Sequence, residues 1–212
     1  EIGRLEGSLF RGLTLGAVTL SRGGHPIVAI EEVSLSYSPR ELWQNGTVIR
    51  RIVITRPRVV AAKQPDGRWD LGALVKRDAR QQNRTGPGRA IEIQAIELVD
   101  ATITLRDPFQ FGAALVPTEF RSLNASVSFA YAPVQWTLVF DKMSWIGHAP
   151  DLTVTHFSGK LGRSTEEWFF DRLAVRTPRS AFTFGGQVLI GDRPTTLDLE
   201  VHAAPFAFQE WS

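Results

Sequence analysis

The sequence contains no cysteine, and this absence removes several chemistries at once. Without thiols the chain has no disulfide framework, no thiolate nucleophile and no sulfur-ligated metal site. It also shows no signal-peptide pattern and no apolar run long enough for a membrane-spanning helix. No window carries a convincing helical stripe of apolar residues. What is left is the composition of an ordinary folded protein, with 43% hydrophobic and 22% charged residues among 212.

The motifs that usually carry catalysis are also missing. The sequence has no Gly-x-Ser-x-Gly elbow, no phosphate-binding loop and no dinucleotide-binding fingerprint. Its four histidines show no spacing that would pair metal ligands: His25, His148, His156 and His202. We therefore predict no enzyme, no cofactor and no metal site. Carboxylates converging in a pocket would revive the enzymatic interpretation.

The strongest positive signal is alternation of apolar and polar residues with a period of two. Along residues 122–129, Leu, Ala, Val and Phe alternate with Ser and Asn, which is typical of an antiparallel strand with one buried face. The same alternation recurs in four other stretches, and its phase switches after Ala95, which predicts a bulge or a bend. The apolar residues singled out from these strands are Val33, Leu35, Ile91, Ile93, Ile103, Leu105, Leu123, Val127, Phe129, Leu197 and Leu199.

Turn-forming residues separate the alternating stretches. They include Gly23-Gly24, Asn45-Gly46, Pro65-Asp66-Gly67, Asp107-Pro108, Ala132-Pro133, Thr177-Pro178 and Gly191-Asp192. Helix is expected only as short turns at residues 39–44 and 70–75, so the predicted fold class is all-β. Residues 76–89 are polar and basic and contain Gly-Pro-Gly. They predict a flexible internal loop within a single domain of residues 1–212.

Positive charge is concentrated in one part of the chain. Residues 50–89 hold eleven Lys or Arg against three Asp or Glu, a local balance of +8, and since the whole chain is +2 the remainder is −6. Such a block can indicate nucleic acid, anionic lipid headgroups or a solvated strand edge. We favour the edge, because positive side chains on edge strands block the association of sheets. No nucleic-acid partner is predicted.

The order of strands and turns resembles a known family. Four stretches carry the resemblance: G-x-L-x-x-G-L-x-L-x-x-V-x-L at residues 7–20, V-x-L-x-Y-x-P-x-x-L at 33–42, I-x-x-I-x-I-x-x-P-x-V at 49–59 and x-D-G-x-W-x-L within 64–71. Together they look like the N-terminal periplasmic segment of AsmA-like and TamB-like bacterial envelope proteins. Residues 173–203 are similar to the middle strands of that family, so the resemblance covers most of the chain.

The resemblance implies a fold and a function. The fold would be an elongated, strongly bent antiparallel sheet whose concave face is a hydrophobic groove, as in bridge-like lipid-transfer proteins. The eleven apolar residues named above would line this groove and hold phospholipid acyl chains. Trp69 and Leu71 would plug its closed N-terminal end. The implied function is to carry phospholipid between the inner and outer membranes, or to support outer-membrane biogenesis.

The resemblance also implies a place in the cell. The chain starts without methionine, and we expect it to be part of a longer protein that a preceding helix anchors to the inner membrane, with the segment itself in the bacterial periplasm. An outer-membrane protein is a further candidate partner.

The alternative function is a β-sandwich module that binds glycan or protein, with Trp136, Trp145 and Trp168 as exposed sugar platforms. A dry, filled interior would favour that alternative.

Overall fold

The computed structural model describes residues 1–8, 12–22, 24–38, 47–64, 69–70, 90–111, 114–190 and 196–207. These residues form fourteen strands and no α-helix, so the all-β prediction is confirmed. The expected helical turn at 39–44, the second one beyond Asp70, and the loop at 76–89 lie outside the described residues. The strands are β1 (Ile2–Ser8), β2 (Gly12–Arg22), β3 (His25–Tyr37), β4 (Thr47–Thr55), β5 (Arg58–Ala61), β6 (Ile91–Leu105), β7 (Phe109–Phe111), β8 (Ala114–Val116), β9 (Glu119–Ala132), β10 (Gln135–His148), β11 (Leu152–Arg163), β12 (Glu167–Arg176), β13 (Ala181–Leu189) and β14 (Thr196–Ala203).

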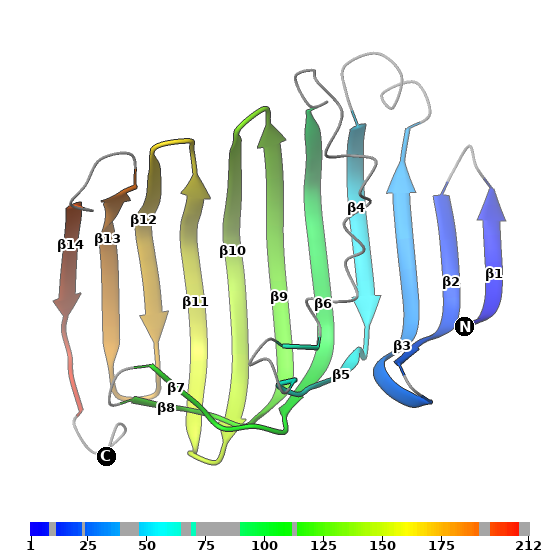
Figure 1. Cartoon of the computed structure of the whole chain (residues 1–212), viewed down its shortest axis with the longest axis horizontal. Helices are drawn as coiled ribbons and strands as arrows, with labels where there is room; N and C mark the ends of the chain where they lie inside the picture. The colour runs from blue at the N-terminus through cyan, green and yellow to red at the C-terminus, as the bar shows by residue number, and fades with distance from the viewer. Residues whose placement is uncertain are drawn as a thin grey trace.

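One large sheet takes in twelve of these strands and follows the chain from one edge to the other (Figure 1). The strand order is β1-β2-β3-β4-β6-β9-β10-β11-β12-β13-β14. β5 pairs with β3 and β6 and so continues the line of β4 beyond Pro57. β7 and β8 form a separate hairpin at the lower end of the sheet, crosswise to its strands (Figure 1). Successive strands are neighbours because short turns join antiparallel partners.

The prediction of a purely antiparallel sheet is wrong at one place. β4 and β5 both run parallel to β6, which makes the sheet mixed. A parallel pair needs a crossover connection of about a dozen residues or more, and the chain between Ala61 and Ile91 is long enough to provide one. The polar segment at residues 76–89 lies in this connection. The sequence therefore indicates where the succession of strands is interrupted. It does not indicate that the next strand runs parallel to the ones before it.

One face of the sheet carries a continuous row of apolar side chains. Cα partners in neighbouring strands place their side chains on the same face, so a row can be followed from strand to strand. The central row crosses eleven strands and consists of Leu5, Leu15, Val33, Ile54, Leu98, Ala125, Met143, Phe157, Val175, Phe182 and Ala203. Every member is apolar. The central row is thus a hydrophobic stripe that runs at right angles to the strands.

Neighbouring strands are irregular at the same level, close to this row. Four residues there have a positive φ: Ala17 (52°), Arg56 (46°), Asp100 (53°) and Ser122 (47°). They come from β2, from the link between β4 and β5, from β6 and from β9. The Arg56 N–H donates to the Val99 carbonyl at 2.8 Å, and the Asp100 N–H donates to Asn124 Oδ1 at 3.0 Å. We call this line of irregular positions the crease, because each bulge bends its strand.

The bulges explain why the apolar pattern changes phase along the strands. Leu98 and Ala101 are three residues apart, yet both pack in one apolar cluster, and the same holds for Phe120 and Leu123. The two residues between each pair therefore project away from that cluster. The bulge predicted after Ala95 is confirmed by a register shift between β6 and β9 in that region.

A cluster of deeply buried residues lies beside the crease. Ala101, Leu123 and Ala125 are only 2%, 4% and 8% exposed. Partly buried side chains surround them: Leu98, Ile103, Phe120, Val127, Met143 and Trp145. At the β14 edge of the same face Leu197 is 63% exposed. The packed part of the molecule is therefore a strip along one face of a single sheet.

Candidate binding face

The structure places all eleven predicted apolar residues on one face. Val33 belongs to the central row, Leu123 pairs with Ala101, and Leu105 pairs with Ala61. The other eight lie in four further rows. The first row is Leu13, Leu35, Ile52, Ile96, Val127 and Phe140. The second row is Tyr37, Ile49, Ile93, Phe129, Leu138, Leu161, Phe170, Gly186 and Leu199. The third row, which we call the rim row, is Thr47, Ile91, Tyr131, Trp136, Arg163, Trp168, Val188 and Leu197, and the fourth, which we call the lower row, is Leu20, Val28, Val59, Ile103, Phe120, Gly147 and Leu152. These four rows and the central row are the apolar face.

The apolar face is largely uncovered in the described part of the chain. Of the eleven predicted residues only Leu123 is buried, whereas Ile91, Leu197 and Leu199 are 37%, 63% and 50% exposed and the other seven are half-buried. The strands of the large sheet contact mainly their hydrogen-bonded neighbours, not a second layer. The chain exposes 14614 Å², whereas a compact protein of 23.6 kDa exposes about 9,800 Å². The excess over a compact fold fits a single-layered sheet, and the exposed side chains of the predicted residues show where apolar surface is open.

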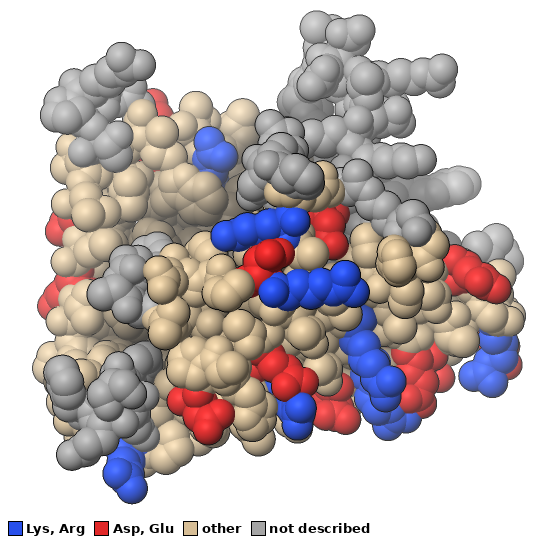
Figure 2. Space-filling model, turned by 60° about the horizontal axis from the view of Figure 1, so that its bottom comes forward, with Lys and Arg blue, Asp and Glu red and all other residues tan. Residues whose placement is uncertain are grey.

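The opposite face of the sheet is more polar than the apolar face. One row there consists of Thr14, Ser34, Val53, Glu97, Ser126 and Lys142. Arg51 on β4 donates from Nε and Nη2 to the two carboxylate oxygens of Glu97, at 2.8 and 2.6 Å. This pairing raises the pKa of Arg51. Figure 2 shows Lys and Arg next to Asp and Glu on the side of the molecule it displays, so neither sign forms a patch there.

The basic segment around residues 50–89 is partly neutralised where the structure describes it. Besides the Arg51 pair, Arg56 binds both carboxylate oxygens of Glu31 on β3. The hydrogen bond from Arg56 lowers the pKa of Glu31. These pairs join neighbouring strands and leave Arg51 and Arg56 engaged within the sheet. The interpretation of the segment as a strand edge is wrong for β4 and β5, because both lie inside the sheet between β3 and β6. For the residues beyond Lys63 it remains a prediction.

Trp69, one of the two predicted plug residues, lies at the end of β5. It forms a single β-bridge with Lys63 and packs edge-on against Phe109 of β7, with 6.4 Å between ring centroids. The Lys63 ammonium lies 5.5 Å from the Trp69 ring and 5.8 Å from Phe109. Trp69 therefore joins the end of β5 to the β7–β8 hairpin. Leu71, the other predicted plug residue, lies outside the described residues.

The chain that leads into β9 covers one end of the apolar face. A Cβ placed on Gly147, in the lower row, would lie 2.7 Å from Pro117 Cγ, so Pro117 fills the space that a side chain would take. Pro117 itself is buried. The segment after β8 thus covers the lower row at Gly147, and the rim row lies at the opposite end of the strands.

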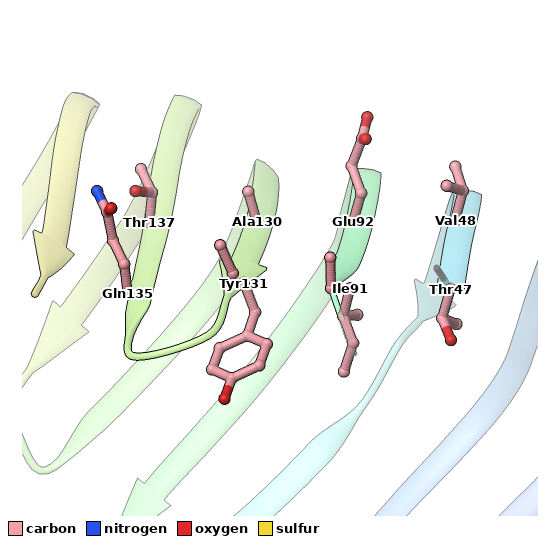
Figure 3. Close-up of a pocket in the computed structure, with 10 residues that line it drawn as sticks. Thr47, Val48, Ile91, Glu92, Ala130, Tyr131, Gln135 and Thr137 are labelled. Carbon is pink, nitrogen blue, oxygen red and sulfur yellow. The ribbon is translucent and has the colours of Figure 1, made fainter. Parts of the chain in front are cut away.

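A hollow of about 330 Å³ opens at the ends of β4, β6, β9 and β10. Its lining includes one carboxylate, Glu92, and one phenol, Tyr131. Figure 3 shows Glu92 and Val48 projecting to one side of the sheet, and Tyr131 and Ile91 to the other. The acid and the phenol do not converge on a common point. The described residues also hold no group of three or more His, Asp or Glu side chains placed to bind a metal ion.

The three tryptophans proposed as sugar platforms are half-buried on the apolar face. Trp136 and Trp168 meet edge to face with centroids 5.4 Å apart. Trp145 packs against Phe120 and Phe157 at 6.4 and 6.3 Å. A sugar stacks on an open, flat ring face, and these rings are engaged with each other or with neighbouring aromatics. They act first as part of the hydrophobic surface.

Sequence reasoning missed most of the apolar face, above all in β10 to β13. Met143, Phe157 and Val175 belong to the central row, in strands where a three-residue step breaks the alternation. Phe182 of the same row alternates regularly with Phe184 in β13. The signal is visible in the sequence as two polar residues between apolar ones, in Phe140-Asp-Lys-Met143 and Phe170-Asp-Arg-Leu173. At both places the strand pairing shows a register shift.

The chain matches no protein-family model, no curated protein and no solved structure. The described residues contain no helix that is long and apolar enough to span a membrane. The resemblance to AsmA-like and TamB-like proteins therefore stays a prediction that depends on the pattern of strands and turns.

Proposed function

We propose that this chain binds phospholipid acyl chains along its apolar face, as a periplasmic segment of an AsmA-like or TamB-like envelope protein. One observation carries the proposal: the central row is apolar at every step across eleven strands, yet the face it occupies has no covering layer in the described residues. An apolar sheet face must be buried against another element or a ligand. Acyl chains are a ligand that could cover it without specific polar contacts.

The dimensions of the face suit this ligand. Eleven strands spaced at about 4.8 Å make the central row roughly 48 Å long. The hydrocarbon of one bilayer leaflet is about 15 Å thick, half of the roughly 30 Å core. The row is therefore long enough for acyl chains to follow one another in file. Each methylene removed from water contributes about 0.8 kcal/mol, so chains of ordinary length would bind by burial alone.

The crease supports a concave apolar face. Bulges at one level in adjacent strands bend the sheet along a line that runs across the strands. Side chains crowd on the inner side of a bend, and two deeply buried residues, Ala101 and Leu123, lie on the apolar side of the crease. We infer that the groove axis follows the central row. Headgroups would stay at the open rim, in water.

The wider role rests on the resemblance alone. The intact protein would carry phospholipid between the inner and outer membranes or support outer-membrane biogenesis, with an inner-membrane anchor and an outer-membrane partner. The alternative of a β-sandwich binding module is weaker. A sandwich needs two sheets packed face to face about 10 Å apart, and the only other sheet in the described residues is the two-stranded β7–β8 hairpin.

Mass spectrometry of an organic extract of the purified protein tests the proposal. We expect phospholipid to co-purify with the parent. Met143→Asp, on the apolar face, should release it, whereas Ser144→Asp, next to it on β10 but pointing to the other side, should retain it. An extract free of lipid, from protein that also fails to take up added phospholipid, would overturn the proposed function.

A further inference from the structure

The rim row contains a charged residue that the rest of the apolar face lacks. Among the residues of its five rows Arg163 is the single Lys, Arg, Asp or Glu. It ends β11, where its Cα partners are Trp136 on one side and Trp168 on the other. Leu161, two residues earlier, lies on the same face in the next row. An arginine on an otherwise apolar surface needs a physical reason.

The Arg163 guanidinium lies against an aromatic ring. Its central carbon is 5.3 Å from the centroid of the Trp168 ring, and Trp168 in turn meets Trp136 edge to face at 5.4 Å. The side chain is exposed, and no carboxylate pairs with it in the described part of the chain. Cation–π stacking uses the face of the guanidinium and leaves the N–H donors at its edge free for a planar anion.

Three other arginines of the sheet have a carboxylate partner within it. Arg51, Arg56 and Arg121 each bind a carboxylate supplied by their own or a neighbouring strand: Glu97, Glu31 and Glu119. No acidic residue occurs in the five rows, so the fold supplies no such partner on the side of Arg163. The donor edge of Arg163 is available to an anion from outside the chain.

The order of side chains along the strands matches the order of groups in a lipid. The central row and the rows beside it are apolar, the rim row adds Tyr131, Trp136 and Trp168, and Arg163 lies among them. Tyr and Trp concentrate where hydrocarbon meets water, because each has an apolar body and a polar tip. Arg is suited to phosphate because its donors form a fork. The rim row therefore has the composition of a headgroup level.

We propose that Arg163 binds the phosphate of an anionic phospholipid whose acyl chains lie on the apolar face. This rests on the proposed function, and it adds the class of lipid and the direction in which it lies, head at the rim row and tails toward the central row. The ligand is selected by its phosphate: a lipid with the same acyl chains and no phosphate should bind less tightly.

The test compares two fluorescent lipids with identical acyl chains, phosphatidylglycerol and diacylglycerol, on the parent protein, Arg163→Gln, Arg163→Lys and Arg121→Gln. The parent should prefer phosphatidylglycerol by at least tenfold, or about 1.4 kcal/mol. Arg163→Gln should abolish this preference and leave diacylglycerol binding unchanged. Arg163→Lys should keep part of it, because the charge remains but the fork is lost. Arg121→Gln, a matched loss of one arginine on the other face, should behave like the parent.

The outcomes separate this inference from the proposed function. If the parent binds neither lipid, the proposed function fails. If it binds both equally, or if Arg163→Gln keeps the preference, acyl binding stands and the role of Arg163 is overturned. Inorganic phosphate should displace phosphatidylglycerol only at a large excess. Displacement at comparable concentrations would assign Arg163 to free phosphate and contradict the lipid as its source.

Discussion

Gly159 on β11 lies so close to Arg172 on β12 that a Cβ built on the glycine would be 2.5 Å from the Arg172 carbonyl oxygen. Gly159 also has a φ of 129°, and Arg172 one of 46°. The two strands therefore bend against each other at a level where only a hydrogen fits. This contact lies between the central row and the rim row, whereas the crease lies between the central row and the lower row, so the second half of the sheet is irregular at a different level. The contact makes a mutational test of this irregularity available.

Gly159→Ala should destabilise the fold by about 1–3 kcal/mol, because the new methyl group meets backbone and the φ angle is unfavourable for alanine. Gly185→Ala is the control. Its nearest neighbour would be 3.9 Å away, so its effect should stay within about 0.5 kcal/mol. Urea unfolding followed by tryptophan fluorescence measures both. Equal effects of the two substitutions would show that the close contact has no energetic role.

Two leucines of the same face should differ sharply in their contribution to stability. Leu123 is 4% exposed beside the crease, so Leu123→Ala should cost about 2–5 kcal/mol through lost burial and a cavity. Leu197, on the edge strand, is 63% exposed, and Leu197→Ala should cost less than about 0.5 kcal/mol. Thermal or urea unfolding gives both values. A large loss for Leu197→Ala would mean that the face is covered in solution.

Charges placed on the half-buried part of the face test whether it is open to water. In a closed core, Val127→Asp or Leu105→Asp would bury an unpaired carboxylate and destabilise by several kcal/mol, about 3 or more. On an open face the carboxylate stays hydrated. We expect both variants to fold and to lose binding of fluorescent phospholipid. Circular dichroism measures folding, and a titration of the same samples measures phospholipid binding. Unfolding of both variants would show that the face is a closed core.

The ion pairs of the polar face predict a modest acid sensitivity. Hydrogen bonding from Arg56 lowers the pKa of Glu31 below its ordinary value of 4.5, and Arg121 does the same for Glu119. A carboxyl whose pKa falls on folding contributes stability at neutral pH and loses it as the pH drops below 4.5. The loss of stability between pH 6 and pH 3 should therefore be smaller in Arg56→Gln than in the parent. Identical pH profiles would show that the pair is inactive in solution.

Local sequence patterns predicted the strands well, because half-buried strands leave a direct imprint of alternation. The turn signals at Asp107-Pro108 and Thr177-Pro178 fall between strands of the structure, and Ala132-Pro133 marks the end of β9. The eleven apolar residues chosen from alternation lie on one face, as their Cα partners show. Each of these features depends on residues close together in the chain, which is why the sequence alone contains them.

Features that depend on distant residues were not predictable. The parallel pairing of β4 with β6 is decided by a long connection, and nothing in either strand records its direction. The alignment of the crease requires Asp100 and Ser122, far apart in the chain, to bulge at the same level. Arg163 carries no local signal either, because a single arginine at a strand end is ordinary. Only the paired strands show that two tryptophans flank it on the apolar face.

The most direct test of the account compares two adjacent residues of β9 that point to opposite faces. Val127 lies on the apolar face between Ile96 and Phe140, and Ser128 lies on the polar face opposite Val139. A photo-crosslinking amino acid placed at each position, in protein incubated with phospholipid vesicles, reports whether acyl chains contact it, and mass spectrometry identifies the adduct. The account predicts phospholipid adducts at position 127 and none at position 128. Equal labelling at both positions, or no lipid adduct at 127, would contradict the claim that the apolar face holds acyl chains.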